Sequence, residues 1–150
     1  MTADDRLYSR ATRLLVAWFG AYQAVHVGVN LLGIPRVANG TLGFPAPSPG
    51  DAWSADLRHF LTAMAVLDLV NAILSLVFVE RYFRRKPSAL WLGATTSFVS
   101  LYGALVFGWG TFTAGAWSQH PWQYALVFLP YIPVVMLVPR VTQLLRDAPP

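Results

Sequence analysis

Residues 59–82 read HFLTAMAVLDLVNAILSLVFVERY, and this stretch determines the class of fold. Asp68 is the only Asp, Glu, Lys or Arg between His59 and Val79. The next charged residues, Glu80 and Arg81, come just before the end of the stretch. A helix of about 20 apolar residues crosses the ~30 Å hydrocarbon core of a bilayer, and a helix satisfies its own backbone polar groups there. We therefore predict that residues 59–82 form a transmembrane helix.

Three further apolar runs have the same character. They predict helices at about residues 11–33, 88–113 and 121–139. Of the 150 residues, 55% are hydrophobic and only 12% are charged, whereas soluble domains carry about 25% charged residues. A chain this short cannot bury four uniformly apolar helices in a core of its own. We expect an all-α, polytopic membrane four-helix bundle that forms a single transmembrane domain over residues 1–150.

Basic residues gather at one side of these predicted spans. They precede the first span (Arg6, Arg10, Arg13), fill the turn between the second and third (Arg81, Arg84, Arg85, Lys86) and follow the fourth (Arg140, Arg146). The other side has Arg36 and Arg58, offset by Asp51 and Asp56. The positive-inside rule then places both termini in the cytoplasm and the Pro/Gly-rich loop at about residues 35–57 outside it, most simply in the plasma (inner) membrane.

Composition also excludes several functional classes. Cysteine is absent, which rules out disulfides and thiolate metal sites, and no pair of histidines lies at i, i+4. No Gly-rich phosphate loop or Gly-x-Ser-x-Gly motif is present. The net charge of +4 follows from topology, so we expect no nucleic-acid partner, no metal and no cofactor. The expected partners are membrane lipids, a lipophilic ligand, and a second copy or a larger membrane complex.

Polar residues in the first two spans form two stripes at helical spacing. Gln23, His26 and Asn30 share one face of the first span, and Asp68, Asn71 and Ser75 share one face of the second. Helices joined in sequence pack as antiparallel neighbours in small bundles, so the two stripes are expected to face each other. At a rise of about 1.5 Å per residue, His26 and Asp68 come within roughly one turn in depth near the midplane.

The pair of His26 and Asp68 carries most of the chemical information. An Asp at the centre of a membrane helix costs about 2.5–3.5 kcal/mol to insert, so it calls for a partner or a role. Such a pair can share a proton, bind a cation or orient an acid/base. The alternative is that polar groups only join helices, an interaction worth about 0.6 kcal/mol each. That alternative applies most to Gln23, Asn71, Ser75, Thr95 and Thr96. Glu80 lies beside Arg81 and Arg84 at the end of the second span, so we expect it to form an ion pair at the membrane interface.

The glycines and prolines of the last two spans indicate how the helices pack around these polar stripes. Gly93, Gly103, Gly108 and Gly110 in the third span are expected to permit close helix packing. Pro130 and Pro133 interrupt the helical hydrogen bonds of the fourth span and predict a kink. Such a kink either opens a cavity beside the stripes, where Tyr131 offers a hydroxyl, or only improves packing.

The layout resembles the EXPERA superfamily of four-helix membrane proteins, which includes emopamil-binding and sigma-2-receptor-like proteins. The resemblance rests on His26-Val-Gly-Val-Asn30, the long loop ending at Trp53, Asp68, and Pro130-Tyr131-Ile132-Pro133. It implies a cavity open laterally to lipid that takes hydrophobic amines or sterols. It also implies that Asp68 matches an acidic position of the second span and His26 a polar position of the first. The chain departs from the family in having no second mid-membrane acid.

Three functional hypotheses follow. The first is a protein that binds a sterol-, isoprenoid- or amine-like molecule in a pocket lined by Gln23, His26, Asn30, Asp68, Asn71 and Tyr131. The second is a membrane isomerase in which Asp68 and His26 are the catalytic acid and base. The third is a non-catalytic accessory subunit of a larger membrane complex, in which the polar stripes serve only to join helices.

Overall fold

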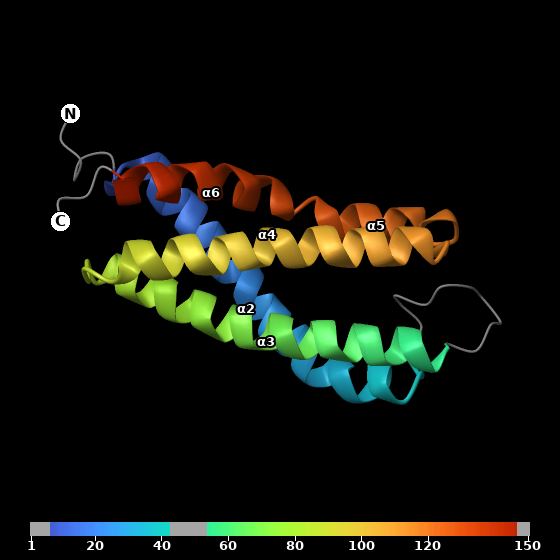
Figure 1. Ribbon diagram of the computed structural model, residues 1–150. Coiled ribbons are helices and arrows are strands. Elements are labelled where there is room, and N and C mark those ends of the chain that lie inside the picture. Colours follow the sequence, from blue (N-terminus) through green and yellow to red (C-terminus); the bar gives the residue numbers. More distant parts are fainter. Residues whose placement is uncertain (1–6, 43–53, 147–150) are drawn as a thin grey trace.

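The computed structural model describes residues 7–42 and 54–146, and the regular structure in these ranges is helical throughout (Figure 1). The helices are α2 (Arg10–Ala38), α3 (Ala55–Phe83), α4 (Ala89–Thr113), the short 3-10 helix η1 (Ala116–Ser118), α5 (Pro121–Phe128) and α6 (Tyr131–Arg146).

Four helical segments are long and apolar enough to cross a membrane. They are α2, α3, α4 and the combined α5–α6 segment, Pro121–Arg146. Their outward surfaces are strongly apolar: Leu32, Trp109 and Leu126 are all more than two-thirds exposed. Such surfaces suit lipid contact, because a soluble monomer rarely exposes large apolar patches. The predicted all-helical class and the four spans are confirmed, and they are those of an integral membrane protein.

The helices of the first two spans run further than the predicted boundaries. The first was predicted to end near Gly33, but α2 continues through Pro35 to Ala38, and the Asn39 N–H donates to the Pro35 carbonyl at 3.1 Å. Proline removes one N–H but its φ is helical, so one lost bond near a helix end is tolerated. At the other side of the loop, α3 begins at Ala55, and the Ser54 hydroxyl caps it by accepting from the Leu57 N–H at 3.1 Å. The rest of the predicted loop, with Trp53, lies outside the described residues.

The helices form a ring in which α2 contacts α3, α3 contacts α4, α4 contacts α6, and α6 contacts α2. The start of α2, the α3–α4 turn and the end of α6 lie at one end of the bundle (Figure 1). We call this the basic end, because the turn carries Arg84, Arg85 and Lys86. The end where α2 stops and α3 starts is called the loop end.

The half of the bundle toward the basic end is tightly packed. Phe19, Phe78 and Leu137, from three different helices, are fully buried in its core. Phe78 lies against Gly93 of α4 so closely that a Cβ at Gly93 would come within 2.5 Å of the ring. The expected close packing at Gly93 is thus confirmed. Toward the loop end the α2–α3 pair diverges from α4 and α5 (Figure 1).

The fourth span is broken where the prolines predicted a kink. Helix α5 ends at Phe128 and α6 begins at Tyr131. Pro130 has no N–H to continue the ladder, and its carbonyl accepts instead from the Trp18 indole N–H of α2 at 3.1 Å. The span also runs past its predicted end near residue 139, because α6 accommodates Pro139 and continues to Arg146.

Candidate functional site

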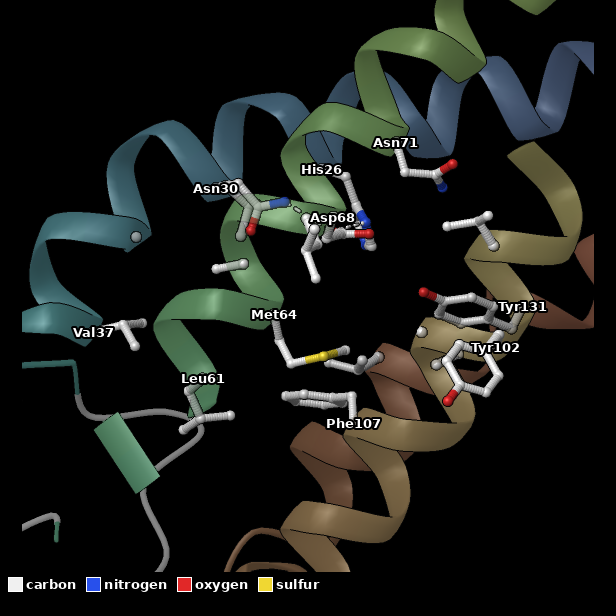
Figure 2. Close-up of a pocket in the computed structure, with 18 of the residues that line it drawn as sticks. His26, Asn30, Val37, Leu61, Met64, Asp68, Asn71, Tyr102, Phe107 and Tyr131 are labelled. Atoms are coloured by element: carbon white, nitrogen blue, oxygen red, sulfur yellow. Dashed lines mark hydrogen bonds and ion pairs between the residues drawn. The ribbon is translucent and has the colours of Figure 1, made fainter. Parts of the chain in front are cut away.

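A cavity of about 320 Å³ lies among the helices between mid-depth and the loop end (Figure 2). Five of the six residues predicted for a pocket line it: His26, Asn30, Asp68, Asn71 and Tyr131. They come from α2, α3 and the start of α6. The break before Tyr131 therefore lies at the cavity, as expected if the kink opens space beside the polar stripes.

Asp68 is the centre of the polar wall. The Asn30 side-chain amide donates to its Oδ2 at 2.7 Å, and Nδ1 of His26 lies 2.9 Å from the same oxygen. The predicted pairing of the two helices at His26 and Asp68 is confirmed by this distance. His26 and Asn30 lie four residues apart on α2, so their side chains share one face of the helix. Both therefore converge on one carboxylate oxygen of α3.

Several polar atoms of His26, Asp68 and Asn71 make none of the contacts found among residues 7–42 and 54–146. They include Oδ1 of Asp68 and Nε2 of His26, because the contacts of both side chains are made by Oδ2 and Nδ1. Asn71 uses its amide nitrogen twice, donating to the Thr96 carbonyl at 3.3 Å and to the Ser100 hydroxyl at 2.8 Å. Its carbonyl oxygen is left as an acceptor. The polar wall therefore presents mainly hydrogen-bond acceptors.

Gln23 differs from the prediction, since it does not line this cavity. It is fully buried one turn closer to the basic end, where its side-chain amide donates to the Ser100 hydroxyl at 2.8 Å. Ser100 Oγ also accepts from Asn71, so one hydroxyl of α4 joins α2 to α3. This Gln23–Ser100–Asn71 junction has the helix-joining role considered for Gln23 and Asn71. The helical spacing of Gln23 could not show whether its side chain lines the pocket or joins helices, because its partner Ser100 lies on a different span.

Two other residues considered for helix joining bond within their own helices. The Ser75 hydroxyl donates to the Asn71 carbonyl at 2.7 Å, and the Thr96 hydroxyl donates to the Leu92 carbonyl at 2.8 Å. Both are the i−4 back-bonds common for Ser and Thr in helices. Glu80 forms the expected interfacial pair, with its Oε1 2.8 Å from Nε of Arg84.

Tyr22 is a member of the site region that the sequence did not single out. Its ring lies 4.2 Å from that of His26 and meets Tyr131 edge-on at 5.0 Å between centroids. Tyr22 precedes His26 by four residues, so the helical spacing was available as a signal. The three rings form a tilted and edge-on cluster that holds the His26 imidazole beside Asp68 and connects α2 to the break in the fourth span.

The cavity becomes apolar toward the loop end. There it is lined by Val37, Leu42, Leu61, Met64 and Phe107 (Figure 2). Phe107 also packs near Tyr124 and Phe128 of α5, at 6.2 and 6.4 Å between ring centroids. A ligand in this cavity would have its polar group at mid-depth and its apolar part toward the loop end.

Two glycines keep the cavity open. A Cβ added at Gly33 or Gly103, which both line the cavity, would meet nothing within 4 Å. The expectation that Gly103 permits close helix packing is therefore wrong, and its missing side chain leaves space instead. Leu67 and Tyr102 line the same cavity while being 65% and 69% exposed. The cavity thus has an opening between α3 and α4, at membrane depth.

The described residues contain no cluster of three or more His, Cys, Asp or Glu side chains that could hold a metal ion. The chain matches no known protein family, curated protein or solved structure in comparisons of its sequence and fold.

Proposed function

We propose that this integral membrane protein binds a lipophilic small molecule in the cavity, in a plasma (inner) membrane with both termini in the cytoplasm. The observation that carries the proposal is the Asp68 carboxylate at mid-depth. One of its oxygens is engaged by α2 and the other faces the cavity without a described partner. A carboxylate at this depth is expensive to maintain, which favours a ligand that pairs with it.

The acceptor-rich wall favours a ligand with hydrogen-bond donors. The free oxygens of Asp68 and Asn71 both accept, and an ammonium group donates up to three hydrogen bonds without accepting any. A lipophilic amine would also neutralise the Asp68 charge in a low-dielectric site. A sterol or isoprenoid alcohol would satisfy one acceptor through its hydroxyl. Among the three ligand classes, the amine therefore fits best.

Cavity size sets a further condition on the ligand. Ligand pockets in proteins occupy about 300–1,000 Å³, and this cavity of about 320 Å³ is at the small end. A sterol-sized molecule would fit only if part of it remained in the opening beside Leu67 and Tyr102. A polar head group with a short apolar body, or a longer chain extending into lipid, satisfies both the volume and the opening.

A second candidate function is supported by one specific observation. His26 lies 2.9 Å from Asp68, a separation at which an acid and a base can exchange a proton. A membrane isomerase would use this pair to add a proton at one end of a three-carbon allylic unit of the bound molecule and to remove one from the other end, which shifts the double bond. Kinship with the EXPERA superfamily would favour such chemistry for some substrates, and that kinship remains a prediction from the residues quoted above.

The test is the lipid content of the purified protein. Wild-type protein and the Asp68→Asn variant are extracted in mild detergent, and bound small molecules are measured by mass spectrometry, with Glu80→Gln as the matched loss of an acid outside the cavity. We expect an amine or alcohol enriched with the wild type and with Glu80→Gln, and lost with Asp68→Asn. Conversion of that molecule to an isomer would indicate the enzyme. An empty protein that stays attached to other membrane proteins would instead support the accessory subunit.

A further inference from the structure

We propose that the basic end of the bundle is a binding surface for the headgroups of anionic phospholipids. The surface is built from the first turn of α2, the last turn of α3 and the α3–α4 turn. Its cations are Arg10, Arg13, Arg81, Arg84, Arg85 and Lys86. This site is separate from the cavity, so the proposal does not depend on what the cavity binds.

Charge balance at this end is strongly positive. In the described part of the chain the only acid at the basic end is Glu80, and Arg84 pairs with it at 2.8 Å. Asp4, Asp5 and Asp147, near the two termini in sequence, lie outside the described residues. Counted together with Glu80 they make four acids, fewer than the six cations named above. Within the described ranges, the loop end has Arg36 and Arg58 beside Asp56. The two ends of the bundle thus differ in their charge.

Helix stability does not account for the cations of α2. Arg10 and Arg13 lie at the N-terminus of this helix, whose first turn contains no acid. The N-terminus of a helix carries a partial positive charge, so cations there are unfavourable and anions are favourable. Phosphate groups outside the helix would compensate both the dipole and the two guanidinium groups. The arrangement therefore points to anions that come from the surroundings.

The α3–α4 turn is held in a fixed shape that presents its cations. Arg85 has a φ of 54° and is the one non-glycine residue of the described chain with a left-handed backbone. Its guanidinium lies over the Tyr8 ring at 4.5 Å, and Nη1 of Arg81 donates to the Ser88 hydroxyl at 2.6 Å. The Lys86 N–H donates to the Arg81 carbonyl at 2.9 Å. Side chains presented by an ordered turn lose less entropy when they bind.

The depth of the surface matches that of lipid phosphates. Phe83 and Trp91 are exposed on the two sides of the α3–α4 turn, at the level where aromatic residues mark the membrane interface. Lys86 lies between them in sequence, beyond the ends of both helices. Arg10, Arg13 and Lys86 have no ion-pair partner among residues 7–42 and 54–146. Guanidinium and ammonium groups at this level form charge-assisted hydrogen bonds to phosphate oxygens.

The test measures lipid binding to the intact protein in neutral detergent. Native mass spectrometry and thermal midpoints are recorded with phosphatidylglycerol, with phosphatidylcholine and with inorganic phosphate. The variant Arg10→Gln/Arg13→Gln/Lys86→Gln removes three unpaired cations, and Arg36→Gln/Arg58→Gln is the matched control at the loop end. We expect selective binding of phosphatidylglycerol, about tenfold weaker in the first variant and unchanged in the control.

Several results would overturn the proposal. Equal binding of the two phospholipids would show that the headgroup charge is not recognised, and an equal midpoint shift with inorganic phosphate would indicate a soluble anion as the ligand. Equal loss in the control variant would show that total charge, and not this surface, controls binding. If the triple variant does not fold, Lys86→Gln alone is measured, since Lys86 is exposed; unchanged phosphatidylglycerol affinity in that variant would also contradict the proposal.

Discussion

Nδ1 of His26 lies 2.9 Å from Oδ2 of Asp68, which joins the middle of α2 to the middle of α3 at the polar end of the cavity. The same carboxylate oxygen also accepts from Asn30. A charged group at this depth is stabilised by such contacts, because no water competes for it in the surrounding hydrocarbon. The pair is therefore expected to affect both ligand binding and the stability of the bundle.

A double-mutant cycle on this pair measures the coupling directly. His26→Phe keeps a ring to pack against Tyr22 and removes the partner of the carboxylate, which should destabilise the bundle by about 1–3 kcal/mol. Asp68→Asn removes the charge, so adding His26→Phe to it should cost less than in the wild type. We expect a coupling of about 0.5–3 kcal/mol from unfolding in mixed micelles. Additive effects would show that the two side chains are close without interacting.

The Gln23–Ser100–Asn71 junction provides a test of the helix-joining contacts. Ser100→Ala leaves two buried amide groups without their shared acceptor, a loss worth about 1–3 kcal/mol in a buried site and less if the amides find other partners. The matched control is Ser118→Ala, whose exposed hydroxyl bonds only to the carbonyl of Gly115. Thermal midpoints in detergent should fall clearly for Ser100→Ala and stay near wild type for Ser118→Ala. A similar midpoint for both variants would mean that the junction does not stabilise the bundle.

The sequence predicted the parts of this structure that depend on local pattern. The apolar runs indicated the four spans, the prolines indicated the break before Tyr131, and spacing placed His26 and Asn30 on the face toward Asp68. Three features could not be read in this way. Whether Gln23 meets the cavity or Ser100, whether Gly103 is packed or open, and which way the Tyr22 ring turns all depend on contacts between spans far apart in sequence.

Close packing at Gly93 should make this position intolerant of even one methyl group. A Cβ there would lie 2.5–2.9 Å from three atoms of the Phe78 ring, which is fully buried in the core. Gly93→Ala is therefore expected to destabilise the bundle by about 1–3 kcal/mol. Gly28→Ala is the matched control, because a Cβ at Gly28 meets nothing within 4 Å. Equal midpoints for the two variants in a thermal scan would contradict the packing seen between α3 and α4.

Filling the cavity without removing any polar group separates the role of its volume from that of Asp68. Gly103 lines the cavity and has open space around its Cα, so Gly103→Leu should place a side chain inside the cavity with little strain. Gly28→Leu adds the same side chain at an exposed position that does not line the cavity. Four added carbons occupy a large part of about 320 Å³, so a ligand that uses the cavity should be displaced.

Retention of the co-purifying molecule, measured by mass spectrometry, should fall about tenfold or more for Gly103→Leu, which corresponds to a loss of at least about 1.4 kcal/mol of binding free energy. Gly28→Leu should retain as much as the wild type. Both variants keep Asp68, His26 and Asn30, so a loss confined to Gly103→Leu must come from the occupied volume. Undiminished retention in Gly103→Leu, in a protein that still folds, would show that the molecule binds on the lipid-facing surface and not in the cavity.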